Sequence, residues 1–544
     1  MARLLQVFGF LSVLFRGATL TFQSLAVGGV VFLIFVVRRA GEDSAALRQA
    51  CLRWIRRSAL ALAAMQVSYV LANSIILRQS ADMSLRDVLG ANFVLAGVIG
   101  VVAAFTLVVL TVPTRSTSYS DLLIPGAAII ASSVMTSHSV ARLDYRAPLV
   151  AFTALHQMAT ATWLGGLPYL LIAIRQAPTP EFARRLGARF SQLALVSVAV
   201  LASAGFLLSL AYVGSIKAVY GTSYGAMVAT KVLLFGLLLF LGALNFQLVR
   251  RGPASSILAS LKRFGEAEIG IGITVILTAA SLTSLPPAAD IAQDRVTGSE
   301  IFARMSPHPP RFGSPSVQEL PEDAYTAQKR AFEVGSLSTE SYVPGQTGTR
   351  PNTPAEKAWS EYNHHWAGIV VLAMGLLALI AQAGRVSWAR NWPLAFFGLS
   401  AFLFLRSDPE TWPLGPVGFW ATLADPEVLL HRFFAVLLIA LAVFEWRVQT
   451  GRVASGRGRL IFPFLIAISG ALLLTHSHSL GNLKEEVLAE LSHIPIAIFA
   501  VTAGWSRWLE LRLPSENQTR NVMARLWPLC IALIGVVLLN YREM

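Results

Sequence analysis

Apolar runs long enough to cross a membrane recur along the whole chain, and short polar stretches separate them. A helix that crosses the hydrocarbon core of a bilayer needs roughly 17–25 mostly apolar residues. The pattern therefore predicts an all-α, polytopic transmembrane bundle of about 14 helices in contact with the lipid bilayer. The predicted spans are 15–37, 58–77, 91–112, 121–135, 149–174, 190–212, 225–249, 266–285, 363–383, 392–406, 428–446, 460–475, 491–509 and 524–540.

Arginine and lysine are distributed unevenly between the two sets of loops that this threading creates. The loops of one set hold clusters of positive residues, whereas the short loops of the other set hold one or two each. Positive residues in short loops stay on the cytoplasmic side of a membrane. We therefore predict that both termini are periplasmic. The clusters are Arg38, Arg39, Arg48, Arg53, Arg56 and Arg57; Arg175, Arg184, Arg185 and Arg189; Arg250, Arg251, Lys262 and Arg263; Arg447, Arg452, Arg457 and Arg459; and Arg507, Arg512, Arg520 and Arg525.

The composition supports a membrane protein and argues against several classes of site. Of the 544 residues, 55% are hydrophobic and only 14% are charged, which excludes a water-soluble domain. The net charge of +14 follows from the loop arginines, so we expect no nucleic-acid partner. The two cysteines, Cys51 and Cys530, form no CxxC pair, which argues against a disulfide framework or a thiolate metal pump. No phosphate-binding, haem-attachment or dinucleotide motif is present, and we expect no enzymatic activity.

The chain divides into three predicted parts. Residues 1–285 form a membrane domain of eight helices, and residues 361–544 form a second membrane domain of six. Between them, residues 286–360 form a polar periplasmic segment rich in Pro, Ser, Thr and Gly, with stretches such as MSPHPPRFGSPS. That composition predicts loop structure, with room for a small helix near 320–333.

The predicted topology places every histidine on the periplasmic side. Histidine is a common metal ligand and is rare within membranes, so the outer face is where chemistry is expected. The nine are His138, His156, His308, His364, His365, His431, His476, His478 and His493.

The first histidine-rich stretch reads TSHSVARLDYRAPLVAFTALHQMATATWLGGL. We predict that His138 lies in a loop and that His156 lies about two turns into the next helix. Trp163 follows His156 by seven residues and therefore shares its helix face. The pair Gly165 and Gly166 permits close contact between helices.

The second stretch reads THSHSLGNLKEEVLAELSHIPIAIFAVTAGW. Two of its histidines end one helix, and a third begins the next on a face shared with two glutamates, so these groups could converge on a metal. The competing interpretation is that Asn482 caps a helix whose first acids favour its positive end. The residues concerned are His476, His478, Glu486, Glu490 and His493. Both stretches repeat S-H-S followed by a distant His, which suggests an internal duplication that matches His138 and His156 with His478 and His493.

Four segments in this order carry a resemblance: ALHQMATATWLGGL, RFSQLALVSVAVLASAGFLLSLAYVGS, GTSYGAMVATKVLL and EAEIGIGITVILTAASLTSLPPA. They resemble the copper resistance protein D (CopD) family of bacterial inner-membrane proteins over roughly residues 10–288. The resemblance implies an eight-helix copper-handling protein that works with a small periplasmic copper-binding protein of the CopC type. The family positions that match are His138, His156, Trp163, Gly165, Gly166, Tyr224, Gly225 and Lys231. The periplasmic segment and the second membrane domain are additional to the smallest unit of this family.

Other residues have more than one interpretation. His364 and His365 lie among aromatic residues at a span entrance, as in an ordinary interfacial belt, and neighbouring helix positions point about 100° apart. Lys231 lies nearly two turns inside a span, where it either faces a partner or cavity or extends outward to the interface. Imidazole suits Cu(II), Zn and Cu(I), and Met135 and Met158 would favour Cu(I) unless they only pack the core.

The leading prediction is a multi-pass protein of the bacterial inner membrane that binds copper, as Cu(I) or Cu(II), for import or transfer in copper homeostasis and resistance. The proposed ligands are His138, His156, His476, His478, His493 and Glu490. One alternative is a haem b redox protein with His156 and His493 as axial ligands. Another is a scaffold that docks periplasmic partners through residues 286–360 without binding metal.

Overall fold

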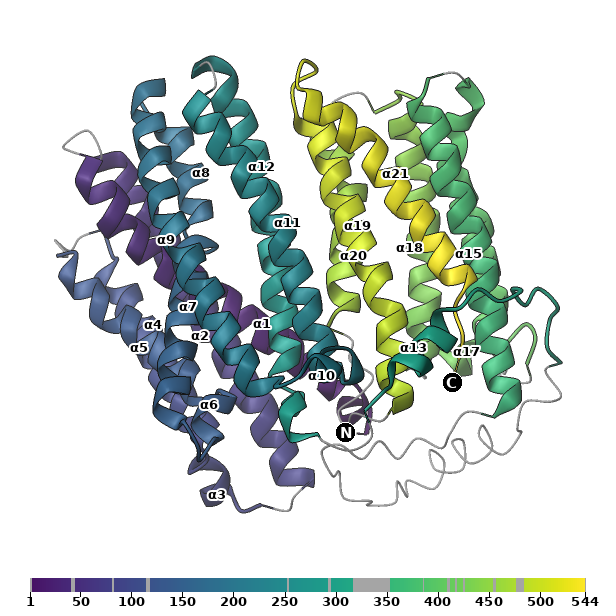
Figure 1. Cartoon of the computed structure of the whole chain (residues 1–544), viewed down its shortest axis with the longest axis horizontal. Coiled ribbons are helices and arrows are strands. Elements are labelled where there is room, and N and C mark those ends of the chain that lie inside the picture. The colour runs from purple at the N-terminus through teal and green to yellow at the C-terminus, as the bar shows by residue number, and fades with distance from the viewer. Residues whose placement is uncertain are drawn as a thin grey trace. The chain divides into compact units, whose positions relative to one another are not determined.

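The structure is a computed structural model, and every regular element among the residues that it describes is helical. The predicted all-α class is therefore confirmed. The described residues are 2–40, 45–80, 83–113, 118–251, 254–291, 295–316, 353–384, 386–408, 411–415, 418–423, 426–453, 456–475 and 484–543. Figure 1 shows long helices that run beside one another within the N-terminal part of the chain and, separately, within the C-terminal part.

Ten helical segments within the described residues are long and apolar enough to cross a membrane. The protein is therefore a multi-pass membrane protein, as predicted. The segments are Phe10–Val37, Ala45–Arg78, Asn92–Leu110, Arg146–Gln176, Pro180–Tyr212, Ser223–Gln247, Ser260–Leu282, Pro354–Gln382, Val487–Arg512 and Gln518–Leu539. The other four predicted spans coincide with α5 (Leu123–Met135), α16 (Ala395–Arg406), α18 (Pro426–Gln449) and α19 (Ile461–Leu473). The count of 14 spans and the periplasmic termini stay predictions.

The chain forms two compact units, which we call the N-terminal unit and the C-terminal unit. The first consists mainly of Leu5–Arg295, and the second mainly of Val296–Leu474 and His478–Met544. Residues 317–352, which contain the small helix suggested near 320–333, lie outside the described residues. The division into two membrane domains and a separate periplasmic segment therefore stays a prediction.

Small residues hold the first helix of the N-terminal unit against its partners. A Cβ atom on Gly165 would lie 1.9 Å from the carbonyl oxygen of Ser24, and one on Gly28 would lie 2.2 Å from that of Ala161. Only glycine allows such an approach of two backbones. The helices of this unit are α1 (Ala2–Phe32), α2 (Ala45–Ser80), α3 (Leu85–Leu89), α4 (Asn92–Leu110), α5, α6 (His138–Ala141), α7 (Arg146–Trp163), α8 (Leu167–Gln176), α9 (Pro180–Tyr212), α10 (Ile216–Gly221), α11 (Ser223–Arg251) and α12 (Ala254–Leu282).

In the C-terminal unit, glycines likewise allow close backbone contact between the first and last long helices. A Cβ atom on Gly375 would lie 2.4 Å from the backbone nitrogen of Ala532, and one on Gly535 would lie 2.3 Å from that of Leu372. Aromatic rings, including Trp392, fill the space between the helices. The helices are α13 (Gly298–Met305), α15 (Pro354–Gln382), α16, α17 (Phe419–Thr422), α18, α19, α20 (Lys484–Arg512) and α21 (Gln518–Leu539).

Several residues that the sequence pattern predicts in loops lie in helices instead. His138 does not lie in a loop but begins the short helix α6. Arg507 and Arg512 are not loop residues, since α20 continues to Arg512, and Arg507 is buried. In the same way α2 begins at Ala45 and already includes the arginines from Arg48 onward.

Candidate functional site

His156 lies on α7 with its side chain directed against α9. Its imidazole hydrogen-bonds to the backbone of Leu201, and its Nδ1 atom is buried without a hydrogen-bond partner among the described residues. The donor to the Leu201 carbonyl is therefore Nε2, which leaves a lone pair on Nδ1. A Cβ atom on Gly205 would lie 3.4 Å from Nδ1 and 3.2 Å from Cε1. The absence of a side chain at Gly205 thus leaves room beside the free nitrogen.

The faces of α7 and α11 bring the residues of two sequence motifs together. Lys231 on α11 lies near enough to His156 for its charge to act on the imidazole. Two turns further along α7, the buried ring of Trp163 meets Phe235 edge to face, with ring centroids 5.9 Å apart. Lys231 and Phe235 are one turn apart on α11 and therefore share a helix face, as His156 and Trp163 do on α7. The shared helix face predicted for His156 and Trp163 agrees with this arrangement.

Gly165 and Gly166 lie in the turn between α7 and α8. Besides the contact of Gly165 with α1, a Cβ atom on Gly166 would lie 2.7 Å from the ring of Phe190 on α9. Tyr169 then donates a hydrogen bond from its hydroxyl to the Leu25 carbonyl, at 3.0 Å. The end of α7 is therefore fixed against two neighbouring helices, which also fixes the position of His156.

His138 lies among aromatic rings near the end of α12. Its Nε2 atom is 3.2 Å from the carbonyl oxygen of Leu282, and its ring meets those of Tyr212 and Tyr224 edge to face. The Tyr212 hydroxyl donates to Ser139 at 3.0 Å. Since a carbonyl needs a donor, Nε2 carries the hydrogen and Nδ1 keeps the lone pair.

In the C-terminal unit, His364 and His493 both approach Tyr541. The ring of His364 stacks on the phenol ring, and the ring of His493 lies 6.0 Å from it. Glu490 is buried on α20, three residues before His493. His476 and His478, as well as the proposed cap Asn482, lie outside the described residues.

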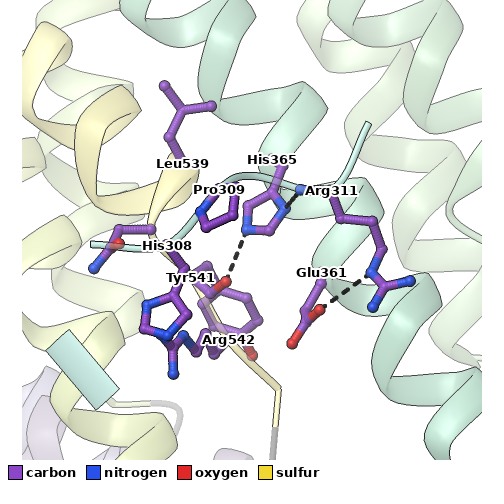
Figure 2. A pocket seen from close by; sticks show the side chains of 9 residues that line it. His308, Pro309, Arg311, Glu361, His365, Leu539, Tyr541 and Arg542 are labelled. Carbon is purple, nitrogen blue, oxygen red and sulfur yellow. Dashed lines mark hydrogen bonds and ion pairs between the residues drawn. The ribbon is translucent and has the colours of Figure 1, made fainter. Parts of the chain in front are cut away.

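His365 has a structural role that occupies both of its ring nitrogens. The backbone N–H of Arg311 donates to Nδ1 at 2.8 Å, so Nε2 must carry the hydrogen that it donates to the Tyr541 carbonyl, also at 2.8 Å. Figure 2 shows this imidazole between the two chain segments, at the edge of a pocket of about 480 Å³. The pocket is also lined by His308, Glu361 and Arg542. While these hydrogen bonds persist, His365 has no lone pair for a metal.

Charged side chains hold together the segments that surround this pocket. Arg311 forms an ion pair with Glu361 at 3.3 Å. The Glu543 carboxylate accepts hydrogen bonds from the Ser360 hydroxyl at 2.6 Å and the Tyr541 hydroxyl at 2.8 Å. Burial opposes ionisation of Glu543, but these hydrogen bonds outweigh it and hold its pKa below the usual value. Burial also raises the pKa of Tyr541, as does the neighbouring Glu543.

Within the described residues, no group of three or more His, Cys, Asp and Glu side chains is arranged to hold a metal ion. His138 and His156 belong to the N-terminal unit, whereas Glu490 and His493 belong to the C-terminal unit. The predicted copper site, including its members His476 and His478, therefore stays a prediction. The axial haem pair of His156 and His493 is divided between the units in the same way.

Comparison with known proteins gives the family context. Residues 184–282 match the family model of copper resistance protein D. The CopD resemblance is thereby confirmed for α9 to α12, a stretch that includes Tyr224 and Lys231 but not His138 or His156. The chain is also similar to the copper transport protein CutJ of Bacillus subtilis (strain 168), with 29% identity over 192 residues, which cover 34% of this chain and 35% of that protein.

The chain therefore aligns with about a third of the length of that relative. No solved structure matches the chain. The CopD match, together with the membrane spans, supports a copper-related protein of the inner membrane, as predicted.

Sequence reasoning missed two members of the candidate site, Gly205 and Phe235. Both lie inside the CopD match, but neither carries a functional group that would attract attention. Phe235 follows Lys231 by four residues, and this spacing is the signal that could have placed it on the lysine's helix face.

Proposed function

We propose that this protein takes up or transfers copper across the inner membrane and contributes to copper homeostasis and resistance. A transport role rather than an enzymatic one fits the CopD match and the name of the similar CutJ protein. One observation carries the proposal: His156, with its unpaired Nδ1 atom, is buried within electrostatic range of Lys231 of the matched segment. A buried nitrogen lone pair that no protein donor uses is available to a soft metal ion.

The surroundings of His156 suit transient binding. A single imidazole holds copper weakly, and a transport site must release its ion as readily as it binds it. The positive charge of Lys231 opposes a second cation nearby and lowers copper affinity further. Replacing Lys231 with Met is therefore expected to increase copper retention at His156 and to slow copper transfer.

We further propose that the periplasmic histidines deliver copper to His156. His138 presents a second imidazole in the same unit, and His476, His478, His493 and Glu490 would provide further sites of copper capture at the periplasmic face. A small periplasmic copper-binding protein of the CopC type would supply the ion. Imidazole ligands accept both Cu(I) and Cu(II), so both oxidation states are compatible with this path.

The test is copper retention by the full chain in lipid nanodiscs, measured by elemental analysis after loading and washing. His156→Ala should lose more copper than His308→Ala, because His308 is exposed and its Nδ1 atom is bonded to the Ser306 carbonyl. Equal copper in the parent and in a His156/His478/His493 triple alanine variant would contradict the proposal. A haem absorption band in the purified parent would favour the haem b alternative instead.

A further inference from the structure

Three charged side chains are buried together in the C-terminal unit, far from its histidines. Glu445 on α18 is fully buried, and Arg507 and Glu510 on α20 are 5% and 9% exposed. All three lie close to the ends of their helices at Gln449 and Arg512. Glu510 follows His493 by 17 residues of the same helix, which corresponds to about 25 Å.

Arg507 forms ion pairs with both carboxylates. Its Nη2 atom lies 3.2 Å from Oε1 of Glu445, and its Nη1 atom lies 2.7 Å from Oε2 of Glu510. The ring of Trp527 covers the guanidinium at 5.0 Å. One positive charge therefore faces two potential negative charges in a space that is largely closed to solvent.

The two carboxyl groups differ in their hydrogen bonds. Glu510 accepts from Trp527 at 2.6 Å and from Gln382 at 3.0 Å in addition to Arg507, so both of its oxygens have donors. Glu445 accepts from Gln449 at 2.7 Å and from Arg507, both at Oε1. Its Oε2 atom is buried and has no hydrogen-bond partner among the described residues. Glu510 therefore has a donor at each carboxylate oxygen, whereas Glu445 has donors at one oxygen only.

Arg507 and Glu510 are the charged groups that act most strongly on Glu445. The neighbouring helices contribute the uncharged Gln382 from α15 and Trp527 from α21. Arg520 of α21 donates instead to the backbone carbonyl of Glu510, at 3.1 Å. With both glutamates ionised, the cluster would carry one uncompensated negative charge inside the bundle, which is strongly unfavourable.

We propose that Glu445 binds one exchangeable proton at Oε2 and that this buried cluster is a proton-binding site of the C-terminal unit. On release, the Oε2–H bond breaks, the proton passes to water near the helix ends, and Arg507 stabilises the carboxylate that remains. Buried carboxyl groups of this kind act as proton relays in membrane transporters. The inference does not rest on copper binding, because none of the copper candidates belongs to the cluster.

The test is infrared difference spectroscopy on the full chain in lipid nanodiscs at neutral pH. A protonated carboxyl group gives a C=O band that shifts in D₂O, and carboxylates absorb elsewhere. Subtracting the spectrum of Glu445→Gln from that of the parent should reveal one carboxylic acid band. Glu516→Gln, which alters an exposed carboxylate between α20 and α21, should leave that band unchanged.

Glu510→Gln provides a second test that keeps Glu445 in place. With one carboxylate removed, Glu445 and Arg507 balance each other, so Glu445 should ionise and the carboxylic acid band should disappear. A structural ion pair without a proton predicts no such band in the parent. Detecting Glu445 only as a carboxylate in the parent, or finding the band intact in Glu510→Gln, would overturn the proposal.

Discussion

The imidazole of His364 stacks on the phenol ring of Tyr541, with ring centroids 3.8 Å apart and planes 20° from parallel. This contact attaches the residues that follow α21 to the first half of α15. Ser360, one turn before His364, completes the attachment through its hydrogen bond to Glu543. The end of the chain is thus held by a stacked ring pair and a carboxylate.

The carboxylate makes this attachment dependent on pH. The pKa of Glu543 is lowered in the folded protein, so its stabilising effect is complete above the usual glutamate value of about 4.3 and is lost as the pH falls through the lowered folded value. Glu543→Gln should lower the free energy of unfolding by about 1–3 kcal/mol at pH 7. Thermal unfolding of both proteins between roughly pH 7 and pH 3 should show this difference vanishing at the acidic end. A difference that does not change with pH would contradict the role of the charge.

His365→Leu should reduce stability without reducing copper retention. The substitution leaves the Arg311 N–H and the Tyr541 carbonyl without their partner, which costs about 1–3 kcal/mol for each group that water cannot reach. Melting temperature and copper content of the same preparation would measure both effects. His308→Leu is the matched control, and as an exposed position it should change stability by about 0.5 kcal/mol or less. Loss of copper with unchanged stability would instead make His365 a ligand.

Gly205→Ala should separate stability from copper binding. Alanine favours a helix over glycine by about 1 kcal/mol, so the variant should be at least as stable as the parent unless the new contact is strained. Its methyl group, however, would lie 3.4 Å from Nδ1 of His156 and restrict access to the lone pair. Copper retention should therefore fall, and copper retention equal to that of the parent would argue against Nδ1 as the binding atom.

Gly165→Ala should be strongly destabilising. Its Cβ atom would lie 1.9 Å from the Ser24 carbonyl, and backbone atoms cannot move aside as a side chain can. We expect a loss above about 3 kcal/mol, or failure to fold. Gly236→Ala is a suitable control, because no atom lies within 4 Å of the added Cβ on α11. Similar melting temperatures for the two variants would show that the helices separate easily.

The predicted topology has a direct test. Reporter fusions after Thr353 and after Glu516 should indicate periplasm and cytoplasm, respectively, because the positive residues cluster on the side of Glu516. A cytoplasmic signal at Thr353 would place the histidines on the inner face and reverse the direction of copper capture.

The sequence correctly predicts which nearby residues share a helix face. It does not predict which residues from different helices pack against each other. The spacing of seven places His156 and Trp163 on one face of α7, and both indeed approach α11. The neighbour of His156 on that helix is Lys231, 75 positions away, and no local pattern relates the two. The clustering of arginines predicts Arg507 in a loop, but Arg507 lies in α20 and its partner Glu445 lies on another helix. The periodicity of an apolar run reports burial and does not identify the neighbouring helix.

The close contact of Gly28 and Gly165 also constrains the order of assembly. The two residues are 137 positions apart. The contact of α1 with the turn before α8 can therefore form only after that turn has been synthesised. In the C-terminal unit, α15 depends in the same way on α21. Since chains emerge from the ribosome at about 5–20 residues per second, each first helix is without its close-packed partner for several seconds. During that interval its glycine-lined face is exposed to lipid and to other nascent helices.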